Sequence, residues 1–345
     1  MKKIYKFSSV MAAAAICLAG ATANSKTYTM KIGMVTINDS NHKLGDWFKK
    51  RLEAQSKGRI KVKVFPAAQL GKIPRQIEGL QFGTQEAFHI PPGFFLGINK
   101  NFMIADAPGL FDSINHQTVA MNHPMIRNKF LALANKKGIT GNVLWGAGDT
   151  SIATLKPMKK LSDIKGSKIR VLATPLEREV MKRIGATGVP MPYSEVLPAL
   201  TQKVIDGVRS AVIVMYPSKF HTAAKHLTLT GMGMIPCWQA LSQVWMKSLP
   251  ADLRAMVVQA GKDSTIQASK WGTSLTTFGE KEWAKVANLY RLSDADQKKL
   301  RELVLPIGDD ILGNDPKTKD MYALLKKAVA ETRGKPLSHI NSYWK

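Results

Sequence analysis

A strand–helix–strand pattern near the N-terminus constrains the fold of this 345-residue chain more than any other feature. Residues 29–36 (TMKIGMVT) and 59–65 (RIKVKVF) have the composition of strands, and in the second segment Ile and Val alternate with Lys. Between them, residues 44–55 carry Leu, Trp and Phe at helical spacing. A crossover of this length joins parallel strands, so we predict a parallel sheet covered by helices.

The same alternation continues through the middle of the chain. A short amphipathic segment covers residues 73–82, strands are predicted over 139–145 and 168–172, and a helix over 174–184 has Pro175 in its first turn. Strands that alternate with helices are typical of the α/β class rather than of a β-sandwich or a helical bundle. We therefore predict an α/β fold.

The last third of the chain is predicted to be mostly helical. Residues 250–287 form either one long helix or two, because Gly272 and Gly279 permit a break. A continuous helix would be roughly 55 Å long at ~1.5 Å per residue, which exceeds a small domain and could join two lobes. Further helices are predicted over 294–304, where Ser293 and Asp296 resemble a capping box, and over 319–332.

The first 23 residues have the pattern of a secretory signal peptide. Three lysines precede an apolar run at residues 10–19, which is too short to span a bilayer, and an Ala-Thr-Ala cleavage sequence follows. We expect export to a bacterial periplasm and cleavage after Ala23. Cys237 is then the only cysteine left, so we expect it to be a small buried apolar residue rather than a disulfide partner.

The chain is strongly basic, with 50 Lys and Arg against 25 Asp and Glu. Loss of the three signal-peptide lysines would lower the formal charge from +25 to +22. The lysines occur singly or in pairs with acids between them, whereas a nucleic-acid-binding surface concentrates them in a stripe. We therefore expect a solvated basic surface and no nucleic-acid partner.

No motif in the sequence demands a metal ion, a cofactor or catalysis. The seven histidines lack metal-binding spacing, no serine lies in a G-x-S-x-G motif, and GAG at 146–148 lacks the third glycine of a dinucleotide site. We predict neither a metal site nor a cofactor, and no enzymatic activity. The residues expected on the surface or in loops are His116, His123, His221, His226, Asp309 and Asp310.

Several ordered segments carry a family resemblance. They are GRIKVKVFPAAQLG (58–71), RQIEGLQFGTQEA (75–87), DAPGLF (106–111), LSDIKGSKIRVLATP (161–175), GATGVPMPYSEVLPALTQKVIDGV (185–208), KHLTLTGM (225–232) and SLPADLR (248–254). Their order and spacing resemble the solute-binding proteins of TRAP transporters, the tripartite ATP-independent periplasmic carriers of the dicarboxylate-binding-subunit family. The resemblance covers nearly the whole chain after residue 23.

The resemblance implies a two-lobe periplasmic binding protein of the type II-like class, with a ligand cleft and a long helix shared by both lobes. On that template, residues 24–147 and 235–275 form lobe I, and residues 148–234 and 276–345 form lobe II. The implied function is capture of a small organic acid and delivery to a membrane permease of a small and a large subunit. We expect a monomer. A sensing or scavenging binding protein and an exported enzyme on the same scaffold are the alternatives.

The resemblance also assigns ligand residues. The arginine of the KIR motif, Arg170, would grip the ligand carboxylate, because its planar fork offers two parallel hydrogen bonds. The alternative is a strand-end arginine paired with a neighbouring acid. Thr150 stands near the place of a second family arginine, and Arg209 and Ser210 replace the Glu-Asn pair that often follows Asp-Gly. These departures predict a pocket of changed shape or polarity.

Aromatic and imidazole side chains are further candidates for the pocket walls. They are Trp145, Trp238, Phe88, His89 and Tyr216, and such residues belong to the core more often than they contact a ligand. Phe88 and His89 precede a Pro-Pro-Gly loop that the family uses in its cleft. If several of them line the cleft, an aromatic or apolar acid would fit better than a strongly hydrophilic one.

Overall fold

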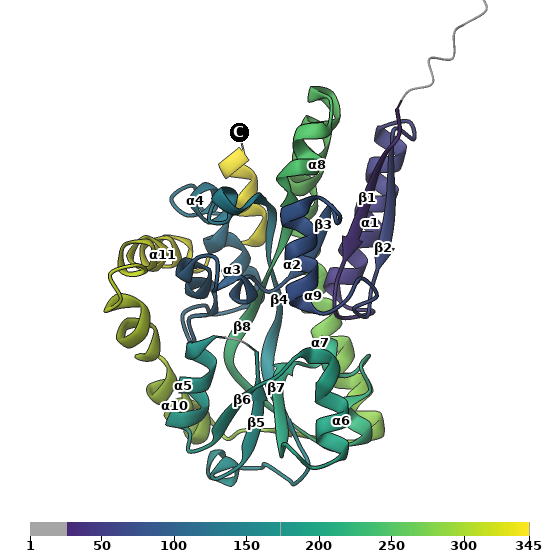
Figure 1. Cartoon of the computed structure of the whole chain (residues 1–345). Coiled ribbons are helices and arrows are strands. Elements are labelled where there is room, and N and C mark those ends of the chain that lie inside the picture. The colour runs from purple at the N-terminus through teal and green to yellow at the C-terminus, as the bar shows by residue number, and fades with distance from the viewer. Residues whose placement is uncertain (1–25, 173, 345) are drawn as a thin grey trace, which may run out of the picture.

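The computed structural model describes residues 26–172 and 174–344, and Figure 1 shows two lobes, one above the other. The expected signal peptide and its cleavage after Ala23 lie outside the described residues. Within the described residues, no helix combines the length and the apolar composition needed to cross a membrane. The α/β class predicted from the sequence is confirmed.

One hydrogen-bonded path of strands runs through both lobes, in the order β2-β1-β3-β8-β4-β7-β5-β6, with β9 beside β8. The strands are β1 (Tyr28–Gly33), β2 (Ile60–Phe65), β3 (Ala87–Ile90), β4 (Ile139–Thr154), β5 (Lys168–Val171), β6 (Thr187–Pro190), β7 (Gly207–Ala211), β8 (His226–Ser242) and β9 (Asn288–Arg291). In each lobe the shorter strands pair in parallel: β2 with β1 and β1 with β3, then β7 with β5 and β5 with β6. The predicted parallel sheet is therefore confirmed in both lobes.

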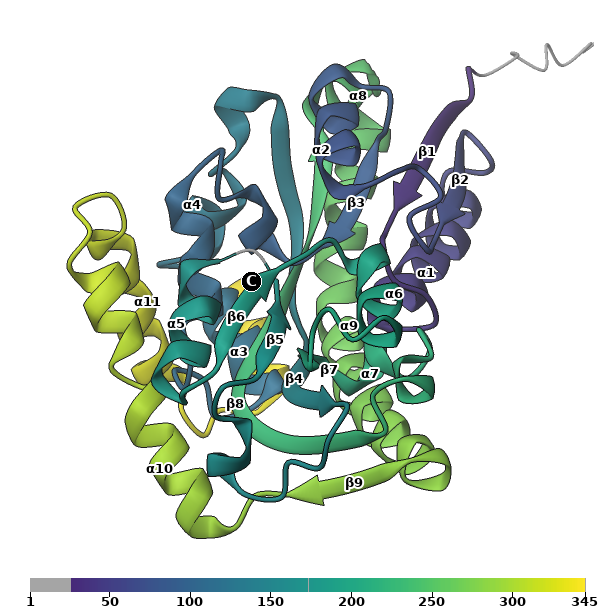
Figure 2. The same ribbon diagram turned by 60° about the horizontal axis from the view of Figure 1, so that its bottom comes forward.

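The two long antiparallel strands β4 and β8 connect the lobes. The C-terminal end of β8 pairs with β3, while the C-terminal half of β4 pairs with β7 and the N-terminal end of β8 pairs with β9 (Figure 2). The register shifts between Gly146 and Gly148 and again between Asp149 and Ser151. Such bulges bend and twist a strand, so β4 changes direction where it passes from one lobe to the other.

β4 is longer than predicted. The sequence predicts a strand over 139–145, but the strand continues through the following Gly-Ala-Gly-Asp-Thr segment, which has low strand propensity. β4 pairs with β8 along its whole length, and these backbone hydrogen bonds hold the segment as a strand despite its low strand propensity.

The helix α9 (Ala251–Val286) is continuous over 36 residues, about 54 Å at ~1.5 Å per residue. Of the two alternatives from the sequence, one long helix is correct. It packs against α1 (Ser40–Gln55) of one lobe and against α7 (Val212–Met215) of the other. Gly272 does not break it: a Cβ there would lie 2.5 Å from the Gly146 carbonyl oxygen, so this glycine permits close packing of α9 on β4.

The remaining helices cover the faces of the sheet. They are α2 (Ile73–Phe82), α3 (Ile114–Met121), α4 (Arg127–Leu131), α5 (Pro175–Arg183), α6 (Val196–Thr201), α8 (Gln243–Ser248), α10 (Asp294–Val304) and α11 (Lys319–Thr332), with short 3-10 turns η1 (Pro92–Phe95), η2 (Lys100–Asp106), η5 (Tyr193–Glu195) and η8 (Leu337–Trp344). The predicted helices over 174–184, 294–304 and 319–332 are confirmed as α5, α10 and α11, and the amphipathic segment over 73–82 forms α2. The Ser293 hydroxyl accepts a hydrogen bond from the Asp296 backbone N–H at 3.2 Å and caps α10 as predicted.

The C-terminal segment packs differently from the prediction. The family resemblance implied that residues 276–345 belong to lobe II, and α10 does pack against α5 of that lobe (Figure 2). However, α11 packs against α3 and η2, and η8 packs against α3 and α9, so both cover lobe I. The pattern of an amphipathic helix shows which of its own faces is apolar but not which surface that face covers. The packing of α11 and η8 against lobe I could therefore not be predicted from the sequence.

His116 also differs from the prediction. It is 5% exposed and lies in α3, where its Nε2 is 3.1 Å from the Val329 carbonyl oxygen of α11. The expected surface histidine is therefore a packing residue between two helices. Asp309 and Asp310 are exposed as predicted, and they pair with Lys326 and Arg183.

Candidate functional site

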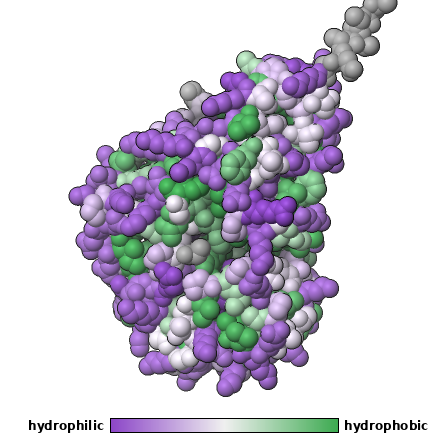
Figure 3. All heavy atoms as spheres, in the orientation of Figure 1, coloured by the Kyte–Doolittle hydropathy of each residue, from purple (hydrophilic) through white to green (hydrophobic). Residues whose placement is uncertain are grey.

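A cavity lies between the lobes, where the parallel strands of both end. The space among its side chains, including the part that is open to solvent, is about 520 Å³. It is lined by Val35, Thr36, Asn41, His89, Ile90, Pro91, Phe94 and Ala147 together with Arg170, Leu172, Tyr193, Ser210, Ala211, Val214, Ile235 and Cys237. The carboxyl ends of parallel strands are the usual place for ligands in open α/β sheets. Figure 3 shows apolar side chains gathered in a hollow between the lobes, on a face that is otherwise mostly hydrophilic.

Arg170 lies on β5 and is held in place by the protein. It is 1% exposed, and its Nε and Nη2 donate hydrogen bonds to the Met191 carbonyl oxygen at 3.1 and 3.0 Å. The guanidinium carbon lies 5.7 Å from the ring centroid of Tyr193, within the range of a cation–π contact. Two of the five guanidinium N–H groups are thus used, and the side chain has a fixed orientation.

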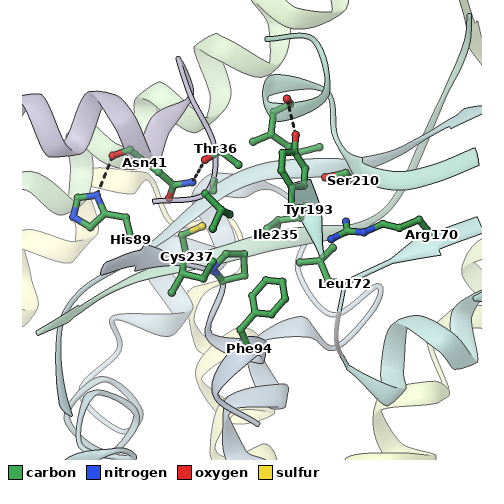
Figure 4. A pocket seen from close by; sticks show the side chains of 16 residues that line it. Thr36, Asn41, His89, Phe94, Arg170, Leu172, Tyr193, Ser210, Ile235 and Cys237 are labelled. Carbon is green, nitrogen blue, oxygen red and sulfur yellow. Dashed lines mark hydrogen bonds between the residues drawn. The ribbon is translucent and has the colours of Figure 1, made fainter. Parts of the chain in front are cut away.

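The other end of the guanidinium is unsatisfied. Nη1 of Arg170 is buried and has no hydrogen-bond partner among the described residues. Burial lowers the pKa of Arg170, but a guanidinium stays protonated at neutral pH, so the site holds a buried cation with free donors. Figure 4 shows the guanidinium pointing among the side chains that line the cavity. A planar carboxylate is the chemical group that fits such a fork.

Arg209 has a different environment. Its Nη1 contacts Glu177 Oε1 of α5, and both side chains are less than a tenth exposed. The second oxygen of Glu177 accepts a hydrogen bond from the Leu172 backbone N–H at 2.6 Å. Burial and the charge of Glu177 raise the pKa of nearby Asp106 well above its ordinary value. Arg209 is not among the residues that line the cavity, and Glu177 neutralises its charge within the protein.

Ser210, the next residue on β7, lines the cavity as predicted (Figure 4). Successive side chains of a strand point to opposite faces of the sheet. Arg209 faces α5, and Ser210 therefore faces the cavity. The two departures from the family pattern therefore have separate consequences. One places a buried ion pair behind the cavity, and the other places a short polar side chain in its wall.

His89 lines the cavity from the first lobe. Its Nδ1 lies 2.9 Å from the Asn41 carbonyl oxygen, which can only accept, and its Nε2 lies 2.8 Å from the Gln239 amide nitrogen, which can only donate. The ring is therefore neutral, with its proton on Nδ1. Burial lowers the pKa of His89 to about 4, in agreement with this hydrogen bonding. His89 shapes the wall and adds no charge to it.

The first turn of α1 supplies polar wall residues that the sequence analysis missed. Asp39 caps α1 by accepting from the His42 backbone N–H at 3.0 Å. Its Oδ2 also accepts from Thr36 Oγ1 at 2.5 Å and from Asn41 Nδ2 at 2.9 Å. Thr36 and Asn41 thus have fixed orientations in the cavity wall. Nothing in the sequence distinguishes this Asp-Ser-Asn turn from an ordinary helix start.

Tyr193 and Leu172 were also missed, although both lie inside segments that carry the family resemblance. The Tyr193 hydroxyl donates to the Val214 carbonyl oxygen at 2.8 Å and lies 2.9 Å from Ser218 Oγ. Its ring contacts Arg170, and its position at the cavity follows from the turn η5. The sequence around Tyr193 could have indicated that it lines the cavity, since an aromatic residue that follows Pro190 and Pro192 is held in a turn.

Three of the predicted aromatic wall residues are core residues instead. Trp238 packs on Phe95 and Phe102, with both ring-centroid distances 4.8 Å. Phe88 belongs to the same apolar cluster and is fully buried. Trp145 belongs to the core cluster of the first lobe. None of the three lines the cavity, because each lies on a strand position that faces a layer of helices or turns.

Thr150 and Tyr216 are placed away from the cavity as well. Thr150 is buried and its hydroxyl donates to the Gly233 carbonyl oxygen at 3.0 Å, which ties β4 to β8 between the lobes. Tyr216 is half-buried and stacks on His221 at 5.3 Å. Thr150 is thus a structural residue of the crossing strands, and Tyr216 packs at the surface of lobe II.

A larger groove adjoins the cavity. On the same measure it encloses about 1690 Å³ of space that is open to solvent. The cavity and the groove share four lining residues, Val35 and Phe94 from the first lobe and Leu172 and Tyr193 from the second. These four side chains therefore stand where the cavity opens into the groove.

The described residues contain no group of three or more His, Cys, Asp or Glu side chains arranged to hold a metal ion. Cys237 is buried in the cavity wall and is not in a disulfide. Burial raises the pKa of its thiol well above the ordinary value, so the thiol is protonated at neutral pH.

A model of the family "bacterial extracellular solute-binding protein, family 7" matches residues 33–314. A solute-binding protein of Verminephrobacter eiseniae is 30% identical over 257 residues, which are 74% of each chain. The 2,3-diketo-L-gulonate-binding periplasmic protein YiaO of Escherichia coli is 25% identical over 324 residues, covering 90% of this chain and 94% of YiaO.

Solved structures show the same fold. The sugar acid binding protein of Advenella mimigardefordensis, in complex with galactonate, has a TM-score of 0.81 at 26% identity and covers 88% of this chain and 99% of that one. A TRAP periplasmic solute binding protein of Desulfovibrio salexigens with bound orotic acid has a TM-score of 0.82 at 22% identity, with the same coverage. The chain therefore belongs to family 7 of the bacterial extracellular solute-binding proteins, the family of the TRAP solute-binding proteins.

Proposed function

We propose that this protein captures an organic acid by holding one of its carboxylates on Arg170. The observation that carries the proposal is the unpartnered Nη1 of a fully buried arginine that lines the cavity between the lobes. A buried cation is costly without a partner, and a carboxylate offers two charge-assisted hydrogen bonds. Relatives in complex with galactonate and with succinate are carboxylate-binding proteins, which supports the assignment.

Binding would close the lobes on the acid. The cavity wall is built by both lobes, so a bound ligand contacts both and favours the closed state. The bulges in β4 are suited to a hinge, and the ion pair of Lys72 and Glu195, 2.8 Å apart, would hold the mouth shut. As lobe boundaries we propose 26–147, 235–275 and 319–344 for lobe I, and 148–234 and 276–304 for lobe II.

The closed, loaded protein would then deliver the acid to a permease of a small and a large membrane subunit. We propose that it acts in the periplasm as a monomer, after removal of the signal peptide at Ala23. Binding and release require no cofactor and no catalysis. Uptake of the bound acid into vesicles that contain the two permease subunits would test delivery.

A ligand screen tests the central step. Thermal unfolding of residues 24–345 is measured across a panel of carboxylic acids, since a ligand that binds only the folded state raises the midpoint. The affinity of each hit is then compared among the wild type, Arg170→Ala and Arg170→Lys. We expect Arg170→Ala to bind at least a hundredfold more weakly, and Arg170→Lys to recover only part of the affinity because it lacks the fork.

The control is Arg51→Ala, which removes an exposed arginine paired with Asp263. Circular dichroism of all variants checks that they are folded. Binding by Arg170→Ala with the affinity of the wild type would overturn the proposal.

A further inference from the structure

We propose that the acid is a monocarboxylate with an extended apolar body, whose tail leaves the cavity and lies in the adjoining groove. The inference rests on the proposed function, because it takes Arg170 as the group that holds the carboxylate. It goes further in naming the chemical class of the ligand and a second subsite for it.

The charge balance of the site favours a single carboxylate. Among the described residues that line the cavity, Arg170 is the only one that carries a charge at neutral pH, since His89 is neutral. Arg209, on the neighbouring strand β7, is already paired with Glu177. A second carboxylate inside the cavity would be buried without a counter-ion, which is strongly unfavourable.

The walls favour an apolar body. Most of the side chains that surround Arg170 are apolar, namely Val35, Ile90, Pro91, Phe94, Ala147, Leu172, Ala211, Val214, Ile235 and Cys237. A sugar acid presents several hydroxyl groups, and each would need a polar partner once buried. Thr36 Oγ1 and Asn41 Nδ2 both donate to Asp39, so of these two side chains only Asn41 Oδ1 is left without a partner among the described residues, which is too few for several hydroxyl groups.

The groove continues this apolar surface. From the four shared side chains it runs between the two lobes over Ile73, Pro74, Ile77 and Ile98 on one side and Pro190, Met191 and Pro192 on the other. The charged residues Lys72, Arg75 and Glu78 also line it, and all three are exposed. A hydrocarbon tail that starts at Arg170 would therefore have apolar side chains of both lobes to lie against.

We commit to the tail of the bound acid as the occupant because the groove is continuous with the cavity through Val35, Phe94, Leu172 and Tyr193. A ligand confined to the cavity would leave these apolar walls to water. Each methylene that leaves water for them should increase affinity by about fourfold.

The experiment uses isothermal titration calorimetry on residues 24–345 with butanoate, hexanoate, octanoate and succinate. We expect affinity to rise about fourfold per added methylene from butanoate towards octanoate. Succinate has the same number of carbons as butanoate and a second carboxylate, and we expect it to bind at least tenfold more weakly.

A variant at Gly97 tests the groove separately. Gly97 lines the groove, is exposed, and has an ordinary φ, and a Cβ there would meet no atom within 4 Å. Gly97→Trp should therefore fold normally and fill the groove. We expect it to bind octanoate at least tenfold more weakly while butanoate binding changes less than twofold. Gly97→Ala is the matched control and should bind both acids like the wild type.

Affinity that falls or stays constant beyond butanoate, or a Gly97→Trp variant that binds octanoate like the wild type, would overturn the tail subsite. Succinate binding as tight as butanoate would overturn the monocarboxylate assignment. These failures are distinct from failure of the proposed function, in which Arg170→Ala would bind acids like the wild type or no carboxylic acid would bind at all.

Discussion

Two buried arginines of the second lobe have opposite surroundings. Arg170 on β5 and Arg209 on β7 lie on neighbouring strands and are 1% and 3% exposed. Arg209 contacts the carboxylate of Glu177, whereas Nη1 of Arg170 has no partner among the described residues. Burial of a charge therefore does not by itself mark a ligand site. A buried charge without a counter-charge does, since Nε of Arg209 also lacks a hydrogen-bond partner within the described part of the chain although Glu177 neutralises the Arg209 charge.

Among substitutions of these buried residues, removal of the Glu177 carboxylate should lower the free energy of unfolding the most. Glu177→Gln keeps an acceptor for the Leu172 backbone N–H but leaves the Arg209 guanidinium buried and unpaired. We expect the free energy of unfolding to fall by about 3 kcal/mol or more. Urea denaturation without ligand measures it.

Glu179→Gln is the matched control, because Glu179 lies on the same helix and pairs with Arg183 near the surface. Loss of this pair should lower the free energy of unfolding by about 1 kcal/mol or less. Equal losses of stability in Glu177→Gln and Glu179→Gln would show that Arg209 does not depend on Glu177 as a buried counter-ion.

The Glu177→Gln variant also leaves Arg209 without its carboxylate partner, so a second cation is available near the cavity. The ratio of succinate affinity to butanoate affinity should therefore rise.

A third buried ionisable group, His89, differs from both arginines because it is buried in its neutral form, and the pH dependence of stability tests this. The pKa of His89 is lowered to about 4 in the folded protein because burial disfavours the charged ring. Between pH 6.5 and 4 the unfolded chain therefore binds more protons at this residue, and stability falls as the pH falls. The contribution of His89 is complete above pH 6.5, and at most about 3 kcal/mol is lost by pH 4.

The measurement is urea denaturation of the wild type and His89→Gln at pH 7.5 and pH 4.5. Buried carboxyl groups such as Asp106 and Asp149, whose pKa values are raised, act in the opposite direction, so the difference between the two proteins isolates His89. We expect His89→Gln to lose less stability on acidification than the wild type. The same loss in both proteins would show that His89 is not held neutral.

Replacement of Arg170 itself should have the smallest effect on stability. Arg170→Met loses the hydrogen bonds to the Met191 carbonyl oxygen but also removes an unpaired buried charge. These terms oppose each other, and we expect unfolding within about 1 kcal/mol of the wild type in the absence of acid. Thermal and urea unfolding measure it. A loss as large as that of Glu177→Gln would mean that Arg170 is a structural residue.

Local patterns predicted much of the fold. The strand–helix–strand unit, the helix α10 with its Ser293 cap and the helix α11 follow from residues close together in the sequence. What could not be predicted depends on contacts between distant residues. The return of α11 onto α3 is one case, and the extension of β4 through its glycines is another.

The site divides in the same way. Arg170 was predicted as a ligand residue because it lies in the short KIR motif that carries the family resemblance, and it does line the cavity. The pairing of Arg209 with Glu177 was missed, since it joins residues 32 positions apart and depends on which face of β7 meets α5. Trp238 was misplaced because composition cannot distinguish an aromatic residue that faces the cavity from one that packs on Phe95.

The most direct test of the central claim is a crystal structure of residues 24–345 with hexanoate. We expect a carboxylate oxygen to lie about 2.7–2.9 Å from Nη1 of Arg170, with Arg209 still paired with Glu177. A carboxylate bound to Arg209, or bound in the cleft without contact to Arg170, would contradict it.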